Sequence, residues 1–276
     1  MSFLLAWLST LLLSFLSWFG AVPNSAQATP SSMTPTPITR TQLAELEQLS
    51  NQALQAANNG NFIEAEAFWS EAIEQFPTNP ALWSNRGNVR VGLNRLEAAV
   101  SDYDRSVELA PDTPDPYLNR GAAYEGLQRW QDAIADYDRV LELDKSDAAA
   151  YNNRGNAKAG LQDWQAALAD YQTAMELEPR LGIARTNYAL MLYQLGDVQE
   201  SLRNFKNLAR RYPQFADVRA AVTAVLWSQG KFGEAESNWV AAVGLDPRYR
   251  DIDWVAGIRR WPPAMVEALE SFLSLS

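Results

Sequence analysis

Five asparagines recur at intervals of 34 residues, and their side chains could bind another polypeptide by its main chain. They are Asn51, Asn85, Asn119, Asn153 and Asn187. A primary amide has two N–H donors and a carbonyl acceptor, so it can pair with the N–H and the C=O of an extended chain. Asparagine is also a poor helix former, so five copies in register need a physical reason. Either the amides contact a ligand, or they bond to the neighbouring repeat and set its stacking.

Catalytic and metal-binding chemistry has little support in this sequence. It contains no His and no Cys, so the commonest general base, the commonest transition-metal ligand and any thiolate are missing. No glycine-rich phosphate loop occurs. Acidic pairs such as Asp102/Asp104 recur at one position of a repeat, which indicates architecture. We therefore expect no catalytic residue, no metal site and no cofactor, and an enzyme is a remote alternative.

The asparagines belong to a tandem array of 34-residue repeats without insertions or deletions, in which they stand at place 6. Apolar residues at places 4, 7–8 and 11, and again at 20, 24 and 27–28, have the spacing of two amphipathic helices. Small residues at places 8 and 20 let the helices approach, and one repeat alone cannot bury its apolar face. Repeats 1 to 6 are residues 46–79, 80–113, 114–147, 148–181, 182–215 and 216–249.

Two further positions have clear structural roles. Place 7 of repeats 2 to 4 is arginine and place 23 is aspartate, so we expect three Arg–Asp pairs between the two helices: Arg86–Asp102, Arg120–Asp136 and Arg154–Asp170. The turn between the helices often needs a residue with positive φ. Six residues occupy that turn: Gly60, Asn94, Gln128, Gln162, Gly196 and Gly230.

This pattern resembles the tetratricopeptide repeat (TPR) over about three quarters of the chain. The resemblance implies an all-α fold, a right-handed superhelical solenoid of six helix-turn-helix repeats, with a concave groove lined mainly by the first helices. Such grooves typically bind a peptide or a protein surface. In superhelical members of the family an asparagine ladder at place 6 holds a peptide's main chain, and we carry that role over to the five asparagines. Further groove positions are Asn88, Asn152, Asn156 and Tyr193.

The charges assigned to this groove are few and acidic, namely Glu47, Asp115, Glu125 and Asp217. They argue against the Lys and Arg clamp with which some family members hold a C-terminal carboxylate. A neutral or mildly basic protein or extended peptide is the favoured partner. The net charge of −10 argues against nucleic acid. Repeat 5 is the basic exception, either as a solvated face or as a docking surface for an acidic partner or anionic lipid.

The N-terminal segment, residues 1–28, is uncharged, largely apolar and ends in Ala26-Gln27-Ala28, which is typical of a cleaved secretory signal. The usual N-terminal Lys or Arg is missing, and the apolar stretch is long enough to span a bilayer, so a retained membrane anchor is the alternative. Residues 29–45 are a Pro/Ser/Thr-rich linker and helix lead-in. We expect export to a periplasm or thylakoid lumen, or membrane association through this segment.

The C-terminal segment, residues 250–276, breaks the 34-residue register. It predicts capping helices over the final apolar face, and a partner-binding helix is the alternative. Residues 239–273, together with the Asn-Arg-Gly repeats, resemble thylakoid-associated TPR proteins of oxygenic phototrophs. That resemblance implies a thylakoid setting and a role in assembling photosynthetic complexes.

We therefore predict a non-catalytic peptide-binding scaffold or assembly factor that grips an extended segment in the concave groove. The alternative is a structural adaptor that docks partners through its convex face and C-terminal cap.

Overall fold

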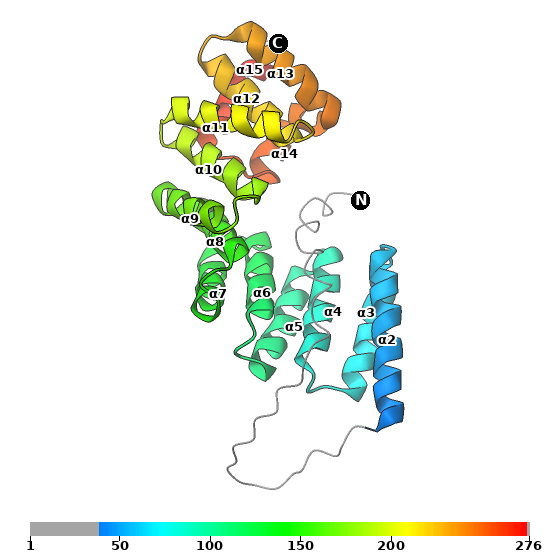
Figure 1. Ribbon diagram of the computed structural model, residues 1–276. Coiled ribbons are helices and arrows are strands. Elements are labelled where there is room, and N and C mark those ends of the chain that lie inside the picture. The colour runs from blue at the N-terminus through cyan, green and yellow to red at the C-terminus, as the bar shows by residue number, and fades with distance from the viewer. Residues whose placement is uncertain (1–38, 275–276) are drawn as a thin grey trace. The chain divides into compact units, whose positions relative to one another are not determined.

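The computed structural model describes residues 39–274, and every regular element in this range is a helix. The helices follow one another as helix-turn-helix hairpins (Figure 1), so the expected all-α repeat fold is confirmed. The described chain forms two compact units that divide between Ala123 and Tyr124. The predicted signal or anchor, residues 1–28, and most of the linker lie outside the described residues.

The first unit begins with a capped helix. Thr39 Oγ1 accepts a hydrogen bond from the Gln42 N–H at 3.2 Å, and Gln42 Oε1 accepts one from the Thr39 N–H at 3.0 Å. This reciprocal capping box satisfies backbone donors that the first turn leaves unpaired. The helices of this unit are α2 (Arg40–Asn58), α3 (Phe62–Gln75), α4 (Pro80–Gly92), α5 (Leu96–Leu109) and most of α6 (Pro114–Gly126).

The second unit begins in the last turn of α6 and continues the same period. From α4 onward successive first helices begin 34 residues apart, and successive second helices do so throughout. The unit ends in a short 3-10 helix and two further helices outside the repeat. Its elements are α7 (Trp130–Leu143), α8 (Ala148–Gly160), α9 (Trp164–Leu177), α10 (Gly182–Gln194), α11 (Val198–Arg211), α12 (Ala216–Ser228), α13 (Phe232–Leu245), η2 (Pro247–Arg250), α14 (Ile252–Gly257) and α15 (Pro263–Leu273).

The turn inside each hairpin has the backbone conformation that the sequence predicts. All six turn residues have positive φ, between 58° at Asn94 and Gln128 and 89° at Gly196. Three are not glycine, and an L-residue in this region costs about 1–2 kcal/mol. In the three middle hairpins Asn94, Gln128 and Gln162 therefore adopt a positive φ that the turn requires, although their side chains disfavour it.

In repeats 2 and 4 glycine at place 8 is required by the tyrosine ring at place 24. A Cβ atom built on Gly155 would lie 2.7 Å from Tyr171 Cε1, and one on Gly87 would lie 2.7 Å from Tyr103 Cε1. Both tyrosine rings are buried, and their hydroxyls donate to Asn156 and Asn88, which holds the rings in place. The close approach of the two helices therefore depends on the missing side chain.

We expect Gly155→Ala to lower the free energy of unfolding by about 1–3 kcal/mol, because the added methyl group overpacks this contact. Gly233→Ala is the matched control: it is also in a helix, and nothing lies within 4 Å of its added Cβ. That control should be neutral or stabilising by up to about 1 kcal/mol through helix propensity. Urea unfolding of both variants tests this, and equal shifts in the same direction would contradict it.

The predicted Arg–Asp pairs are confirmed in repeats 2 and 4. Arg86 donates through Nε and Nη2 to Asp102 at 2.9 and 2.7 Å. Arg154 donates in the same way to Asp170 at 2.9 and 2.7 Å. The third pair, Arg120–Asp136, stays a prediction. Such bidentate pairs fix both distance and orientation between the helices of a hairpin.

The same arginines also join neighbouring hairpins, which the sequence did not predict. Arg154 Nη1 donates to Asp138 Oδ1 on α7 at 2.7 Å, and Arg120 Nη1 donates to Asp104 Oδ1 on α5 at 2.7 Å. Hydrogen bonding to Asp170 is the main cause that raises the pKa of Arg154, so the guanidinium stays charged. Place 7 therefore binds place 25 of the preceding repeat as well as place 23 of its own.

Candidate polypeptide-binding face

One side of every first helix carries the residues that the sequence singled out for binding. Places 2, 5, 6, 9, 12 and 13 are three or four residues apart, so they share one side of an α-helix. We call this side of α2, α4, α6, α8, α10 and α12 the binding face. It carries all five place-6 asparagines and the four acidic groove residues.

In the first unit the place-6 amides are available. Asn51 is exposed, and Asn85 and Asn119 are half-buried. Within the described part of the chain these three side chains form no hydrogen bond. Asn88 differs, because its Oδ1 accepts a hydrogen bond from the Tyr103 hydroxyl at 2.7 Å. The row of place-6 amides here has its donors and acceptors free for a ligand.

In the second unit the amides bond to one another. Asn187 Nδ2 donates to Asn152 Oδ1 and to Asn156 Oδ1, both at 3.1 Å, and so joins α10 to α8. Asn152 is buried, and its Nδ2 donates to Asn153 Oδ1 at 3.1 Å. Asn156 Oδ1 also accepts from the Tyr171 hydroxyl at 3.0 Å. This network corresponds to the stacking alternative.

The chain's own C-terminal segment lies on the binding face of the second unit. α15 packs against α12 and α10. The Ala264 N–H donates to Gln194 Oε1 on α10 at 2.9 Å, so a side-chain amide of the binding face holds a main-chain group of a crossing segment. The ring of Phe272 meets Trp227 of α12 edge-on at 5.1 Å and Trp239 of α13 at 5.2 Å. The segment therefore covers both the binding face of this unit and part of α13, the last helix of the repeats.

Asp217, at place 2 of α12, is the buried centre of this contact. Its side chain is 3% exposed. It accepts hydrogen bonds from the Tyr249 hydroxyl at 2.5 Å, the Trp261 indole N–H at 3.0 Å and the Arg259 guanidinium at 3.0 and 2.9 Å. The charge of Asp217 raises the pKa of Arg259, so the guanidinium stays charged. A buried charge with this many partners holds Tyr249 of η2 and two residues of the C-terminal segment in one geometry.

Glu125, at place 12 of α6, is the second buried acid that the C-terminal segment reaches. The Tyr137 hydroxyl donates to its Oε1 at 2.6 Å. Arg260 Nη2 donates to its main-chain oxygen at 3.2 Å, and Arg260 Nη1 lies 3.5 Å from Oε2. Burial raises the pKa of Glu125 to about 7, although Tyr137 and Arg260 oppose the shift. Arg260 adopts a φ of 55° to make these contacts.

Two acids that sequence reasoning placed separately in a groove are thus bound by two consecutive arginines. Sequence reasoning missed Gln194 as a binding-face residue, and it missed Arg259 and Arg260 as residues of the C-terminal segment that contact this face. The available signal was an Arg-Arg-Trp run outside the repeats of an acidic chain. Tyr193, which the sequence placed in the groove, is half-buried against the core of this unit.

The described residues contain no cluster of three acidic side chains that could hold a metal ion. None of the helices between residues 39 and 274 has the length and apolar character needed to cross a membrane.

The hairpin period of 34 residues defines a helical-repeat protein. Models described as TPR repeat or tetratricopeptide repeat match residues 87–128, 114–147, 152–216 and 187–249. These matches cover more than half of the chain, and the chain belongs to the tetratricopeptide repeat family. A comparison with curated proteins gives no match.

Solved structures share the fold at low sequence identity. A TPR protein from Parabacteroides merdae is 21% identical with a TM-score of 0.64, over 84% of this chain and 86% of that one. YrrB, described as a TPR protein with an unusual peptide-binding site, is 22% identical with a TM-score of 0.52, over 65% and 92%. MamA from Desulfovibrio magneticus is 19% identical with a TM-score of 0.56, over 60% and 94%.

Proposed function

We propose that this protein is a non-catalytic scaffold or assembly factor whose binding face holds an extended segment of a partner protein. One observation carries the proposal: the binding face of the second unit already holds a polypeptide segment, the chain's own. A glutamine amide on that face binds a main-chain N–H, and two buried acids bind arginines. These are the groups with which the same face would hold a partner.

The first unit offers the same chemistry, and none of the described residues bonds to its place-6 amides. Asn51, Asn85 and Asn119 provide amides for main-chain N–H and C=O groups, and the exposed acids Glu47 and Asp115 lie on the same face. A mildly basic extended segment is therefore the favoured partner. Helices 8–10 Å apart advance at most ~20 Å per repeat, and an extended chain covers ~3.3 Å per residue. Three amides thus serve a segment of roughly 12 residues.

The relatives support this reading of the face. YrrB is described as having a peptide-binding site, and TPR proteins commonly bind peptides or proteins. Export and the membrane anchor stay predictions on residues outside the described range, and the thylakoid setting stays a prediction from the resemblance of residues 239–273.

The test is selection of 12-residue peptides from a random displayed library on the purified full chain, followed by titration of the selected peptides. We expect Asn85→Ala with Asn119→Ala to weaken binding at least about tenfold, because two main-chain hydrogen-bonding pairs are lost. The matched control is Asn204→Ala with Asn207→Ala, two asparagines on the second helix α11. It should leave the affinity unchanged.

Equal affinity in the two double variants would contradict the proposal. Binding that responds only to changes on the second helices or on α15 would instead support the structural-adaptor alternative. Circular dichroism of each variant separates loss of binding from loss of fold.

A further inference from the structure

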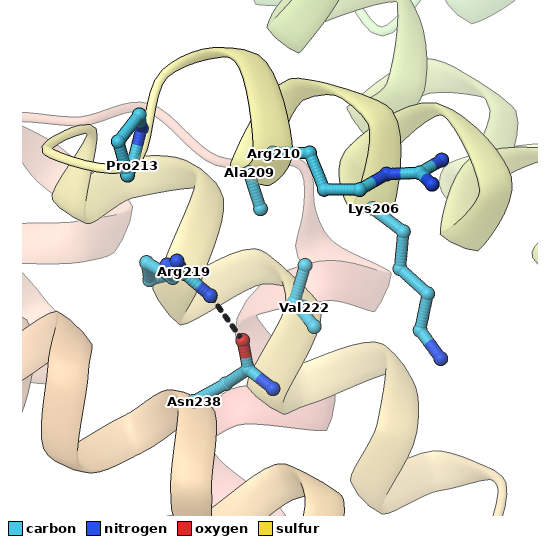
Figure 2. Close-up of a pocket in the computed structure, with 7 residues that line it drawn as sticks. All are labelled: Lys206, Ala209, Arg210, Pro213, Arg219, Val222 and Asn238. Atoms are coloured by element: carbon cyan, nitrogen blue, oxygen red, sulfur yellow. Dashed lines mark hydrogen bonds between the residues drawn. The ribbon is translucent and has the colours of Figure 1, made fainter.

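A hollow of about 450 Å³ lies among α11, α12 and α13, away from the binding face (Figure 2). Lys206 and Arg210 extend along one side of it from α11. Arg219 from α12 and Asn238 from α13 lie on the other side, and Val222 lies between this pair and Lys206 (Figure 2). None of the described residues that line it is acidic. This is a concentration of positive charge in a protein of net charge −10.

The hollow stands where earlier repeats hold their Arg–Asp layer. In repeat 4 that layer is Arg154 at place 7, Asp170 at place 23 and Asp138 at place 25 of the preceding repeat. In repeat 6 the same three places are Val222, Asn238 and Lys206. The buried cation is replaced by a short apolar side chain, one carboxylate by a neutral amide and the other by a cation. Compared with repeat 4, repeat 6 therefore has neither the long arginine side chain that fills this space nor the two carboxylates that bind it.

Arg219 has a buried donor that the protein does not satisfy. Its Nη1 donates to Asn238 Oδ1 at 3.1 Å, but its Nε is buried and has no hydrogen-bond partner among the described residues. Arg185 occupies the same place in repeat 5, and its Nε donates to the Pro179 carbonyl at 3.1 Å. A buried cationic donor without a partner is unfavourable, so its presence here needs an explanation.

The other cations around the hollow are held only loosely. Lys206 Nζ pairs with Glu234 at 3.0 Å, but the two side chains are 44% and 57% exposed. A pair this exposed contributes little, so Lys206 is able to turn toward a ligand. Among the described residues Arg210 donates a hydrogen bond only to Asn207 Oδ1.

We propose that this hollow binds one oxoanion group, a phosphate or a carboxylate, carried on a small organic molecule. The oxoanion accepts from the guanidinium of Arg219 and from Lys206 or Arg210, and so takes the place of the missing aspartates. Arginine matches the fork geometry of both oxoanions. The volume is within the usual range of small-molecule sites and leaves room for an apolar body against Val222.

The experiment is calorimetric titration of the full chain with three probes that share one ring: phenyl phosphate, benzoate and benzyl alcohol. We expect saturable binding of phenyl phosphate, benzoate or both, with a Kd at or below about 1 mM. The stronger of the two identifies the preferred oxoanion. Benzyl alcohol, which has no charge, should not bind, and inorganic phosphate should compete.

Two variants and one control localise the site. Arg219→Gln should weaken anion binding at least about tenfold, since a charged donor pair is lost. Asn238→Asp restores the carboxylate of repeats 2 and 4 beside Arg219, so it should abolish anion binding while raising the thermal midpoint. Arg203→Gln removes one charge from the same helix as Lys206, but Arg203 is 70% exposed and outside the hollow. It should bind anions like the wild type.

The proposal is overturned if neither anion binds saturably, or if Arg203→Gln weakens binding as much as Arg219→Gln does. The second result would show a diffuse effect of surface charge. Because Asn238→Asp is expected to be more stable than the wild type, its loss of binding cannot be attributed to unfolding.

Discussion

Replacing Asp217 by alanine should release the C-terminal segment from the binding face and lower the free energy of unfolding by about 3–5 kcal/mol. The substitution removes the only carboxylate that the structure shows bonded to Arg259, and it leaves the Tyr249 hydroxyl and the Trp261 indole N–H without their acceptor. A buried arginine without a counter-ion is far costlier than the pair it replaces. We therefore expect the segment to leave the face instead of staying with unpaired donors.

Limited digestion with trypsin measures the release, because the main chain at Arg259 and Arg260 becomes free to enter the protease when the segment leaves. Urea unfolding measures the loss of stability. The matched control is Glu236→Ala, which removes an exposed acid of α13. An Asp217→Ala protein with wild-type stability and wild-type resistance at these arginines would show that the contact is dispensable.

The second large effect concerns pH and Glu125. Its pKa is about 7 in the folded protein and about 4.5 in an unfolded chain. Between these values the folded state holds a proton that the unfolded state has lost. The stability from this group is therefore complete below pH 4.5 and is lost as the pH rises through 7, by up to about 3 kcal/mol.

Glu125→Gln should remove this part of the pH dependence, because an amide does not titrate. The Tyr137 hydroxyl can still donate to the Gln carbonyl oxygen. We expect the difference in unfolding free energy between variant and wild type to shift in favour of the variant from pH 5 to pH 8. Parallel stability curves across that range would mean that Glu125 titrates near its usual pKa in the folded protein.

The fold was largely predictable from the sequence because its determinants are local and periodic. The positive φ of Gln162, the contact between Gly155 and Tyr171 and the pair of Arg86 with Asp102 each depend on residues within one hairpin. A pattern that repeats every 34 residues shows each such contact several times, so the residue types that the contact requires can be told from those that vary by chance.

The binding face was only partly predictable. Whether a place-6 amide is free or bonded depends on its neighbours: Asn187 finds Asn152 at place 5, and the first-unit asparagines have no such partner among the described residues. The contact between Arg260 and Glu125 joins residues 135 positions apart and belongs to no repeat. No periodic pattern reports a contact that occurs once.

Because Arg154 bonds to two neighbouring hairpins, it affects how cooperatively the repeats unfold. Its guanidinium bonds to carboxylates of two hairpins, Asp138 and Asp170. Unfolding of either hairpin leaves a charged group of the other without its partner, so the unfolding of the two hairpins is coupled. Repeat 6 has Val222 in that position and lacks this coupling. There the C-terminal segment provides the coupling instead, since Tyr249 of η2 and two residues that follow α14, Arg259 and Trp261, all bond to Asp217 on α12. Cooperativity at the last hairpin thus depends on a segment that is not part of any repeat, and cutting the chain after residue 250 should turn one melting transition into two.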